Sequence, residues 1–180
     1  IFVASGCGEP QYLVRAMVHY VESHPKAFFD TEIMHVYSFG IAPYTDPKFK
    51  RNFRHNSFFI GNNTRGPVNQ GLADYTPVSL SDVPALIRSG AVRIDVALVQ
   101  TSLPDDHGYM SLGISVDMVK TATDRASLWS AGRLKRMMGM LAVLAALMIG
   151  RQVLASFGTM MMPSTLRVMK SSICALCLPR

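Results

Sequence analysis

One short apolar run, residues 94–99, constrains the fold most strongly. Its sequence, Ile-Asp-Val-Ala-Leu-Val, is mainly aliphatic and β-branched, and polar turn residues follow it. Such a run suits a strand covered on both faces, as in a parallel sheet flanked by helices. The polar segment after it would then leave the carboxyl end of a strand, the edge at which open α/β sheets bind ligands. We therefore predict an α/β fold with an open, mainly parallel sheet and helices on both faces.

The segment after this strand has the composition of a shaped loop. Pro104 fixes a backbone angle, the two aspartates that follow favour a turn, and Gly108 permits angles that other residues avoid. His107 is a candidate general base in this loop. The sequence places no partner acid for it, so a hydrogen bond that fixes the loop is the favoured role.

The chain opens with a predicted strand at residues 1–4, a glycine turn and a helix at residues 11–23. Gly6 and Gly8 would let backbone amides approach an anion or carbonyl oxygen near the start of the helix. A tight turn without a ligand is the alternative. The dinucleotide-binding fingerprint needs a third glycine where this chain has Gln11, so the match to it is weak.

A second strand is predicted within residues 32–40, and residues 42–56 then interleave basic and aromatic side chains. Nucleic-acid-binding surfaces show this mixture. An irregular helix with Phe49 and Phe53 packed inward is favoured instead, because residues 1–128 carry no basic excess. We therefore expect no nucleic-acid partner.

A third strand is predicted at residues 57–60, with an Asn-rich loop at residues 61–67 after it. Gly61 and Asn62 bring neutral hydrogen-bonding groups, and Arg65 adds a guanidinium suited to a carboxylate or phosphate. This loop is the second candidate binding segment. The other predicted elements are a strand at 74–78, a helix capped by Ser81 and Asp82 that Gly90 terminates, and a helix at 116–126.

The composition changes abruptly near Leu128. Residues 1–128 hold 11 Lys and Arg against 12 Asp and Glu, a formal charge of −1, whereas residues 129–180 hold seven Lys and Arg and no acid. We predict that the strand due at this point is missing and that an atypical basic, Met-rich tail begins at residue 129. Either a membrane-surface tail or a shift of reading frame near Leu128 would explain the change.

The tail offers neither a membrane span nor a metal site. Its apolar run, residues 137–150, is shorter than the roughly 20 residues of a transmembrane helix. Cys174 and Cys177 are separated by two residues, a spacing found in zinc knuckles and in redox pairs. They supply only two of the four ligands that a structural zinc ion needs. No metal is therefore expected. Cys7 makes the cysteine count odd, which indicates a reducing compartment, so a cytoplasmic location is expected. The chain starts inside an apolar run without Met, so we expect the fold to be incomplete at both ends.

Several ordered motifs resemble the amino-terminal domain of the acetyl-CoA hydrolase/4-hydroxybutyrate CoA-transferase family. They are Phe-Arg-His-Asn-Ser-Phe-Phe-Ile-Gly-Asn-Asn-Thr-Arg at 53–65, Ala-Asp-Tyr-Thr-Pro at 73–77, Val-Gln-Thr-Ser at 99–102 and Pro-Asp-Asp-His-Gly-Tyr-Met-Ser-Leu-Gly at 104–113. The resemblance runs from residue 1 to about residue 128. It implies a two-domain enzyme in which a glutamate forms an acyl anhydride and then a glutamyl-CoA thioester.

In that family the glutamate belongs to the carboxyl-terminal half, so the resemblance implies a nucleophile outside this chain and no such role for Glu9. It implies a CoA thioester as substrate, no bound cofactor, a short-chain carboxylate as second substrate, the carboxyl-terminal half as partner, and a homo-oligomer when complete. Whether a carboxylate or water takes the acyl group stays open. The residues expected to face the substrate are Gly6, Gly8, Gly61, Asn62, Arg65, Gln100, Thr101, Ser102, Asp105, His107 and Gly108.

Two other functions fit parts of the pattern. A Rossmann-like dinucleotide-binding domain would use the first glycine turn, although the third glycine is missing. A non-enzymatic module would use the basic tail on acidic membranes. The CoA-transferase or hydrolase assignment rests on more motifs than either alternative, and we expect this chain alone to be inactive.

Overall fold

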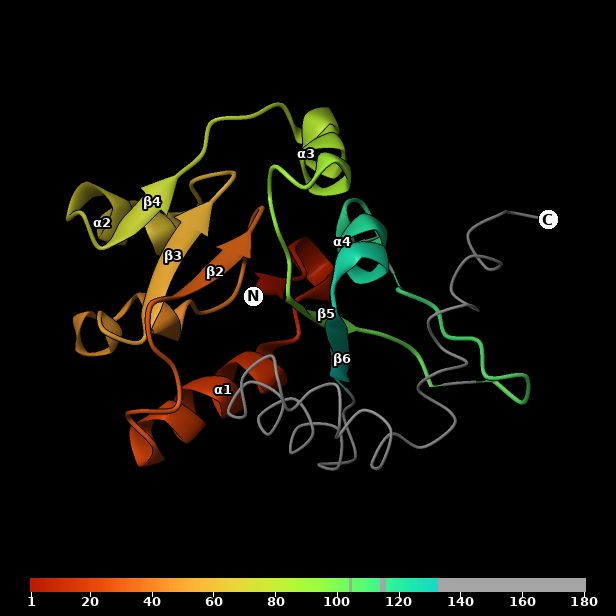
Figure 1. Cartoon of the computed structure of the whole chain (residues 1–180), viewed down its shortest axis with the longest axis horizontal. Coiled ribbons are helices and arrows are strands. Elements are labelled where there is room, and N and C mark those ends of the chain that lie inside the picture. Colours follow the sequence, from red (N-terminus) through yellow and green to blue (C-terminus); the bar gives the residue numbers. More distant parts are fainter. Residues whose placement is uncertain (104, 114–115, 133–180) are drawn as a thin grey trace.

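A single parallel sheet organises the protein (Figure 1). The computed structural model describes residues 1–103, 105–113 and 116–132. Within them all neighbouring strands pair in parallel, in the order β4-β3-β2-β1-β5-β6. The strands are β1 (Phe2–Val3), β2 (Thr31–His35), β3 (Phe53–Ser57), β4 (Ala73–Tyr75), β5 (Val96–Gln100) and β6 (Leu128–Gly132). The predicted open parallel α/β sheet is confirmed.

Helices cover both faces of this sheet, as predicted, and each face has its own hydrophobic core. Helix α1 (Gln11–Ser23) packs on one face together with the short turns η2 (Pro43–Thr45) and η3 (Pro47–Phe49). Helices α3 (Val83–Ser89) and α4 (Val119–Arg125) pack on the other, and Figure 1 shows the two groups on opposite sides. The remaining helical elements are η1 (Gly6–Gly8), α2 (Asn62–Asn69) and η4 (Leu80–Asp82).

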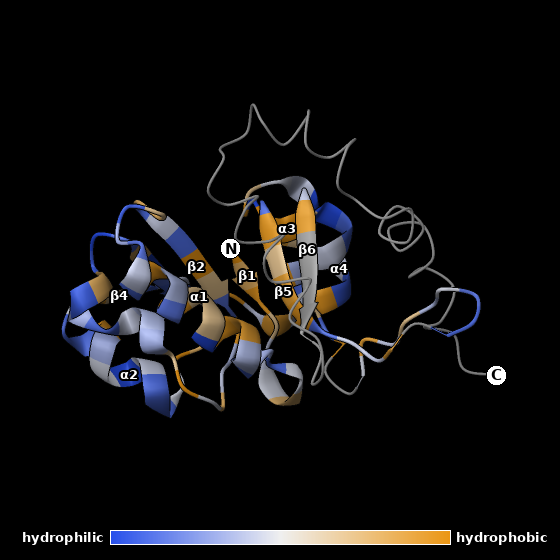
Figure 2. Cartoon of the chain, turned by 90° about the horizontal axis from the view of Figure 1, so that it is seen from below, coloured by the Kyte–Doolittle hydropathy of each residue, from blue (hydrophilic) through white to orange (hydrophobic). Residues whose placement is uncertain are grey.

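Strand β5 shows why its apolar run is uninterrupted. Val96 and Leu98 belong to the core under α1, whereas Ala97 and Val99 belong to the core under α3 and α4. Successive side chains of a strand point to opposite faces, so a strand buried on both sides needs apolar residues at every position. Figure 2 shows the consequence: β1 and β5 in the sheet centre are hydrophobic, and α2 and β4 at the edge are mostly hydrophilic.

The third strand lies earlier than predicted. It spans Phe53–Ser57, so Phe58 and Phe59 follow it instead of forming residues 57–60 as a strand. Two buried positions of β3 are occupied by the polar residues His55 and Ser57. The alternation of buried and exposed positions in this strand is therefore not visible as an alternation of apolar and polar residues. The irregular helix expected at 42–56 is two short 3₁₀ turns, η2 and η3. Phe49 does pack inward, as predicted.

The Asn-rich segment predicted as a loop is helical. Helix α2 begins at Asn62, directly after Gly61, and continues to Asn69 with Pro67 inside it. Asparagine, glycine and proline all have low helix propensity, and so the local sequence favoured a loop. Packing of the buried Thr64 beneath the first turn overrides that preference.

A sixth strand is present where none was predicted. Strand β6 runs parallel to β5, with Leu128 opposite Val96 and Gly132 opposite Gln100. An edge strand is held by backbone hydrogen bonds on one side, so it can form without an apolar run. Strand β6 therefore crosses the predicted boundary between 1–128 and 129–180.

Other boundaries differ by a few residues. The helix predicted at 116–126 is α4, the strand predicted at 74–78 is β4, and Asp82 precedes α3 without a capping bond from its side chain. Gly90 ends α3 with φ +81°, as expected of a C-terminal glycine. In the described part of the chain no helix is long and apolar enough to cross a membrane. The expectations about Pro104 and about the tail beyond Gly132 fall outside the described residues.

Candidate functional site

The carboxyl ends of all the described strands lie at one edge of the sheet, because every strand pair is parallel. The chain leaves β1 toward β2 on one side and leaves β5 toward β6 on the other. Such a switch of direction separates the two loops and marks the usual ligand site of an open α/β sheet. The Gly6 turn follows β1 and the loop beginning at Thr101 follows β5, so both candidate segments start at this edge.

The glycine turn after β1 is hydrogen-bonded to the segment that follows β2. Gly6 has φ +61°, and its N–H donates to the carbonyl oxygen of Tyr37 at 2.8 Å. Gly8 is buried, and its N–H donates to the carbonyl of Ser5 at 3.3 Å. The amides proposed to meet a substrate oxygen are therefore already hydrogen-bonded within the chain. Cys7, between them, is exposed.

Gly40 joins three of the edge loops. Its N–H donates to Oε2 of Glu9 at 2.8 Å, and its carbonyl accepts a 2.6 Å hydrogen bond from Nδ2 of Asn63. Gln11 donates to the same Glu9 oxygen at 3.0 Å. A Cβ on Gly40 would lie only 2.0 Å from Nε2 of Gln11, so a larger residue here would have to displace the end of that side chain. The segments after β1, β2 and β3 are thus tied together through the backbone N–H and carbonyl of one residue.

Sequence reasoning did not identify Gly40 or Asn63 as site residues. A glycine soon after a predicted strand was the one signal for Gly40. Asn63 was lost within a segment interpreted as a loop. Its Oδ1 is buried and accepts no hydrogen bond from the described residues.

The second candidate segment is the first turn of α2. Gly61 is buried, and its N–H donates to Oγ1 of Thr64 at 3.1 Å. A Cβ at Gly61 would lie 2.9 Å from the ring of Tyr37, so glycine allows this close approach. Asn62 and Arg65 are exposed on the helix. The guanidinium of Arg65 is therefore accessible to an anion at this edge.

Three aromatic residues gather beside this turn. The ring of Tyr37 packs edge-on against Phe39 at 4.6 Å between ring centroids and against Phe59 at 5.3 Å. Phe39 and Phe59 are 67% and 56% exposed. Aromatic side chains exposed together are typical of a surface that binds an apolar group. No pattern in the sequence indicated that these residues, from two different loops, would meet.

The third candidate segment, residues 101–113, forms an arm. Ser102 and Ser111 hold its base through two 2.9 Å hydrogen bonds, Ser102 N to Ser111 O and Ser111 N to Ser102 Oγ. At the tip, Oδ1 of Asp105 accepts from the backbone N–H of His107 and of Tyr109 at 2.9 and 2.8 Å. The carboxylate of Asp105, and the backbone rather than the imidazole of His107, therefore fix the loop.

The arm extends away from the sheet, on the opposite side of the molecule from α2 (Figures 1 and 2). The projecting end of the arm and helix α2 are therefore on different sides of the molecule, whereas Gly6 and Gly61 both contact Tyr37. Gln100, Thr101 and Ser102 stay at the base of the arm, near the end of β5. The structure thus brings together two of the three predicted segments.

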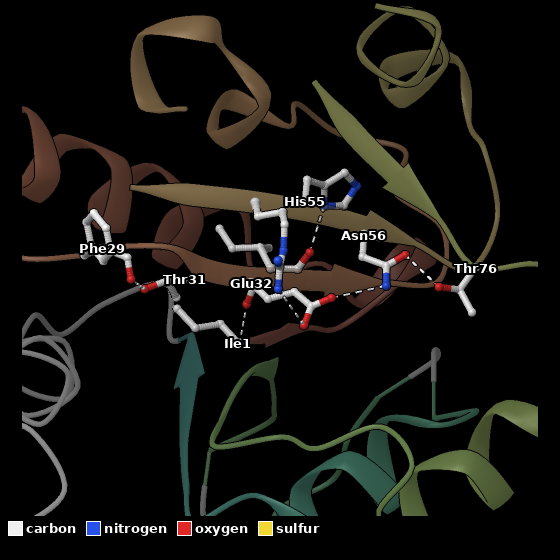
Figure 3. A network of polar contacts seen from close by, with 9 residues as sticks. Ile1, Phe29, Thr31, Glu32, His55, Asn56 and Thr76 are labelled. Carbon is white, nitrogen blue, oxygen red and sulfur yellow. Dashed lines mark hydrogen bonds and ion pairs between the residues drawn. The ribbon is translucent and has the colours of Figure 1, made fainter. Parts of the chain in front are cut away.

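A ladder of polar side chains joins β2, β3 and the residue that follows β4 (Figure 3). Oε1 of Glu32 accepts from Nδ2 of Asn56 at 3.2 Å, and Oδ1 of Asn56 accepts from Thr76 at 3.0 Å. This ladder fixes the neighbouring strands β2 and β3 and the end of β4. Across residues 1–103, 105–113 and 116–132, no group of three or more His, Cys, Asp or Glu could hold a metal ion.

Comparison with known proteins gives consistent relatives. The chain is 41% identical over 128 residues to a 4-hydroxybutyrate coenzyme A transferase from Clostridium kluyveri, covering 71% of this chain and 29% of that protein. It is 37% identical over 127 residues to a succinyl-CoA:acetate/propanoyl-CoA:succinate CoA transferase from Fasciola hepatica, covering 71% and 26%. The chain thus spans less than a third of the length of these curated relatives.

Solved structures agree on the fold. The 4-hydroxybutyrate CoA-transferase of Porphyromonas gingivalis superposes with a TM-score of 0.54 at 25% identity, over 72% of this chain and 27% of that one. RipA from Yersinia pestis gives 0.62 at 18% identity, over 72% and 32%. The family model for the acetyl-CoA hydrolase/transferase N-terminal domain matches residues 1–129. The chain therefore belongs to the acetyl-CoA hydrolase/transferase family, through its N-terminal domain.

Proposed function

We propose that this chain is the substrate-side half of a CoA-transferase or acyl-CoA hydrolase that moves CoA between short carboxylic acids. Family membership supports the reaction class. The single structural observation that carries the proposal is the backbone of Gly40, whose N–H is bound by Glu9 while its carbonyl is bound by Asn63. It makes the loops after three neighbouring strands into one rigid surface at the edge where such sheets bind ligands.

On this surface each group has a distinct task. The exposed guanidinium of Arg65 attracts a carboxylate or a CoA phosphate, and Asn62 offers an amide donor and acceptor beside it. The exposed rings of Phe39 and Phe59 contact the apolar part of the acyl thioester. Gly6, Gly8 and Gly61 let the backbone and the Tyr37 ring pack closely enough to form the surface.

The loop after β5 has a separate place in this proposal. Gln100, Thr101 and Ser102 would approach the thioester from the β5 side of the sheet edge. Asp105, His107 and Gly108, at the tip of the arm, would meet substrate held against the carboxyl-terminal half of the enzyme. Two sides of the acyl-CoA would then be contacted by different parts of this chain.

The nucleophile in this proposal is a glutamate outside this chain, which forms the glutamyl-CoA intermediate. Glu9 is a poor substitute, because its carboxylate is buried and accepts hydrogen bonds from Gly40 and Gln11. A carboxylate held in this way positions a loop. The carboxyl-terminal half of the enzyme is then the partner, with a homo-oligomer as the complete form and the cytoplasm as its location.

Complementation tests this placement. The chain is assayed for CoA exchange between acetyl-CoA and 4-hydroxybutyrate, alone and mixed with the separately produced remainder of the Clostridium kluyveri relative. Activity in the mixture alone is the expected result. Activity of this chain by itself would move the nucleophile into it, to Glu9 or Cys7. A mixture that co-elutes on size exclusion and yet exchanges no CoA would contradict the proposed reaction.

A further inference from the structure

Four polar side chains form a buried chain of hydrogen bonds on the α1 face of the sheet. Tyr44 Oη lies 2.9 Å from Nδ1 of His35, whose Nε2 lies 2.9 Å from Oγ of Ser57. The same Ser57 oxygen lies 3.0 Å from Nε2 of His55, whose Nδ1 lies 3.0 Å from the carbonyl oxygen of Ile33. Each of the four side chains is at most 3% exposed. The function proposed above uses none of them.

While both imidazole rings are neutral, the donors and acceptors of these hydrogen bonds can be arranged in one direction only. The carbonyl of Ile33 can only accept, so Nδ1 of His55 carries a proton. Burial lowers the pKa of His55 to about 4, so its ring is neutral at pH 7 and its Nε2 accepts from the hydroxyl of Ser57.

The same reasoning continues to Tyr44. The Ser57 oxygen accepts from Nε2–H of His35, and burial together with the nearby His55 holds the pKa of His35 well below its usual value. Neutral His35 then accepts at Nδ1 from the Tyr44 hydroxyl. The pKa of Tyr44 is raised by burial and by Glu9, so that hydroxyl keeps its proton. Every proton in the chain thus points from Tyr44 toward Ile33.

One added proton can reverse this direction. The rings of His35 and His55 are 4.4 Å apart between centroids, so repulsion opposes charging both. In this reversal the Ser57 hydroxyl passes its proton to Nε2 of His55 and receives the proton of Nε2 of His35. Nδ1 of His35 then receives the proton of the Tyr44 hydroxyl. Tyr44 takes its replacement from a solvent hydronium ion. The sum is one proton gained and one imidazolium, at His55, with His35 converted to its Nδ1–H tautomer.

Two charged groups act on the chain from neighbouring elements. Glu9, from the turn before α1, acts on Tyr44, and Asp74, on β4, favours the charged form of His55. In the reversed state the hydroxyl of Tyr44 accepts from His35 and must donate elsewhere. The carboxylate of Glu9, which accepts the Gly40 N–H, contributes to the raised pKa of this hydroxyl.

We propose that Tyr44, His35, Ser57 and His55 form an acid-sensitive switch beneath the sheet edge: uptake of one proton reverses this series of hydrogen bonds, so that the Tyr44 hydroxyl accepts from His35 instead of donating to it. His35 is the last residue of β2, and Ser57 is the last residue of β3. The loops bearing Tyr37 and Gly61 therefore start directly above the switch. This inference is independent of the CoA-transfer proposal, because it concerns only the protonation of these four side chains.

Nitrogen NMR of the full-length protein labelled with ¹⁵N-histidine tests the switch. At pH 7 we expect Nδ1–H on His55 and Nε2–H on His35. On acidification His55 should become doubly protonated while His35 changes to Nδ1–H, with one shared midpoint. The opposite tautomers at pH 7, a His35 tautomer that does not change, or unfolding before any change would each overturn the proposal.

Two substitutions of Ser57 separate the relay from simple packing. Ser57→Thr keeps the hydroxyl, so the two histidines should still change together at one midpoint. Ser57→Ala removes the link, so the His35 tautomer should no longer follow His55. If the histidines of the Ser57→Ala protein still change together, the serine relays nothing and the proposal fails. Should that variant not fold, the tautomers and midpoints of the unmodified protein decide by themselves.

Discussion

At the scale of single residues, glycine has two different uses in this protein. Gly40 has Gln11 against it, with 2.0 Å between Nε2 and the position of an added Cβ. Gly66, inside α2, has nothing within 4 Å of the same position. A side chain at the first position would displace Gln11, whereas the second glycine is only a poor helix former. The two positions therefore make a matched pair for substitution.

We predict opposite effects of alanine at these positions. Gly40→Ala displaces the end of Gln11 from Glu9, and the loss of that hydrogen bond should lower the free energy of unfolding by about 0.5–1.5 kcal/mol. Gly66→Ala should raise it by up to about 1 kcal/mol, because alanine favours the helix. Urea unfolding at pH 7 measures both. Equal changes for the two variants would contradict the packing explanation.

Buried histidine makes stability depend on pH. The pKa of His55 is about 4 in the folded chain and 6.5 in the unfolded chain, so the unfolded chain binds the proton more tightly. The stabilisation is therefore complete above about pH 6.5 and is lost as the pH falls toward 4. For His55 the loss reaches about 3 kcal/mol, at about 1.4 kcal/mol per pKa unit.

Urea unfolding at a series of pH values measures this loss. His55→Asn, which cannot titrate, should have a flatter stability curve between pH 6.5 and 4. His19→Gln removes a histidine of which 82% of the side chain is exposed, so it should keep the slope of the parent protein. Parallel curves for all three proteins would show that His55 is not the titrating group.

At the scale of elements, α2 depends on a tertiary contact more than on its composition. Oγ1 of the fully buried Thr64 accepts from the N–H of Gly61, which fixes the start of the helix at the sheet edge. Residues 61–67 contain glycine, asparagine and proline, which explains why a loop was predicted. The helix exists because its first turn packs on the core.

Substitution of Thr64 tests that contact. Thr64→Val has nearly the same shape but leaves the Gly61 amide without its partner, which should cost about 1–3 kcal/mol of unfolding free energy. Thr64→Ser keeps the hydroxyl and should lose less, through the missing methyl group alone. Thermal or urea unfolding of the two variants gives the comparison. A serine variant less stable than the valine variant would mean that packing, not the hydrogen bond, holds the turn.

The arm after β5 is an element held by its own hydrogen bonds. Asp105→Ala removes the acceptor of two backbone N–H groups, those of His107 and Tyr109, so their hydrogen exchange should quicken by about tenfold. Global stability should change little, because Asp105 is exposed and the part of the arm that enters a core, Met110 and Leu112, lies beyond the two hydrogen bonds that the substitution removes. Asp106→Ala, the exposed neighbour, is the control and should leave both exchange rates unchanged. Equal rates in the two variants would remove the structural role assigned to Asp105.

At the scale of the whole molecule, the parallel sheet gathers the carboxyl ends of β1, β2 and β3 at one edge, and the loops there interlock through Gly40. The arm after β5 points elsewhere (Figure 1). The proposed site therefore has a rigid part near α2 and a projecting part at the arm. A carboxyl-terminal half of the enzyme is expected to complete the space between them.

Arg65 provides a test at this scale. In the complementation assay, Arg65→Gln should lower kcat/KM for CoA exchange by about tenfold, as expected for the loss of one charge-assisted contact. Arg15→Gln, an equally exposed arginine on α1, should have no effect. Both variants should unfold at the same urea concentration as the parent. An unchanged rate for Arg65→Gln would remove this arginine from the proposed site.

The sequence alone determined the fold class and much of the order of elements. The apolar run before Gln100 required cover on both faces, and helix α1 was correct from Gln11 to Ser23, because its apolar spacing and the His24-Pro25 ending are local patterns. The same patterns failed for β3, α2 and β6. Polar residues face the core in β3, packing overrides propensity in α2, and an edge strand in β6 needs little apolar sequence.

Only the tertiary structure decided which side chains meet. His35 and Ser57 are 22 positions apart, and Gly40 is 31 positions from Glu9. Such pairs leave no periodic trace in the sequence, because their contact depends on strand register and on how far each loop reaches over the sheet edge. Local sequence determined where strands end and polar residues begin, and the parallel pairing of distant strands determined which of those residues share a site.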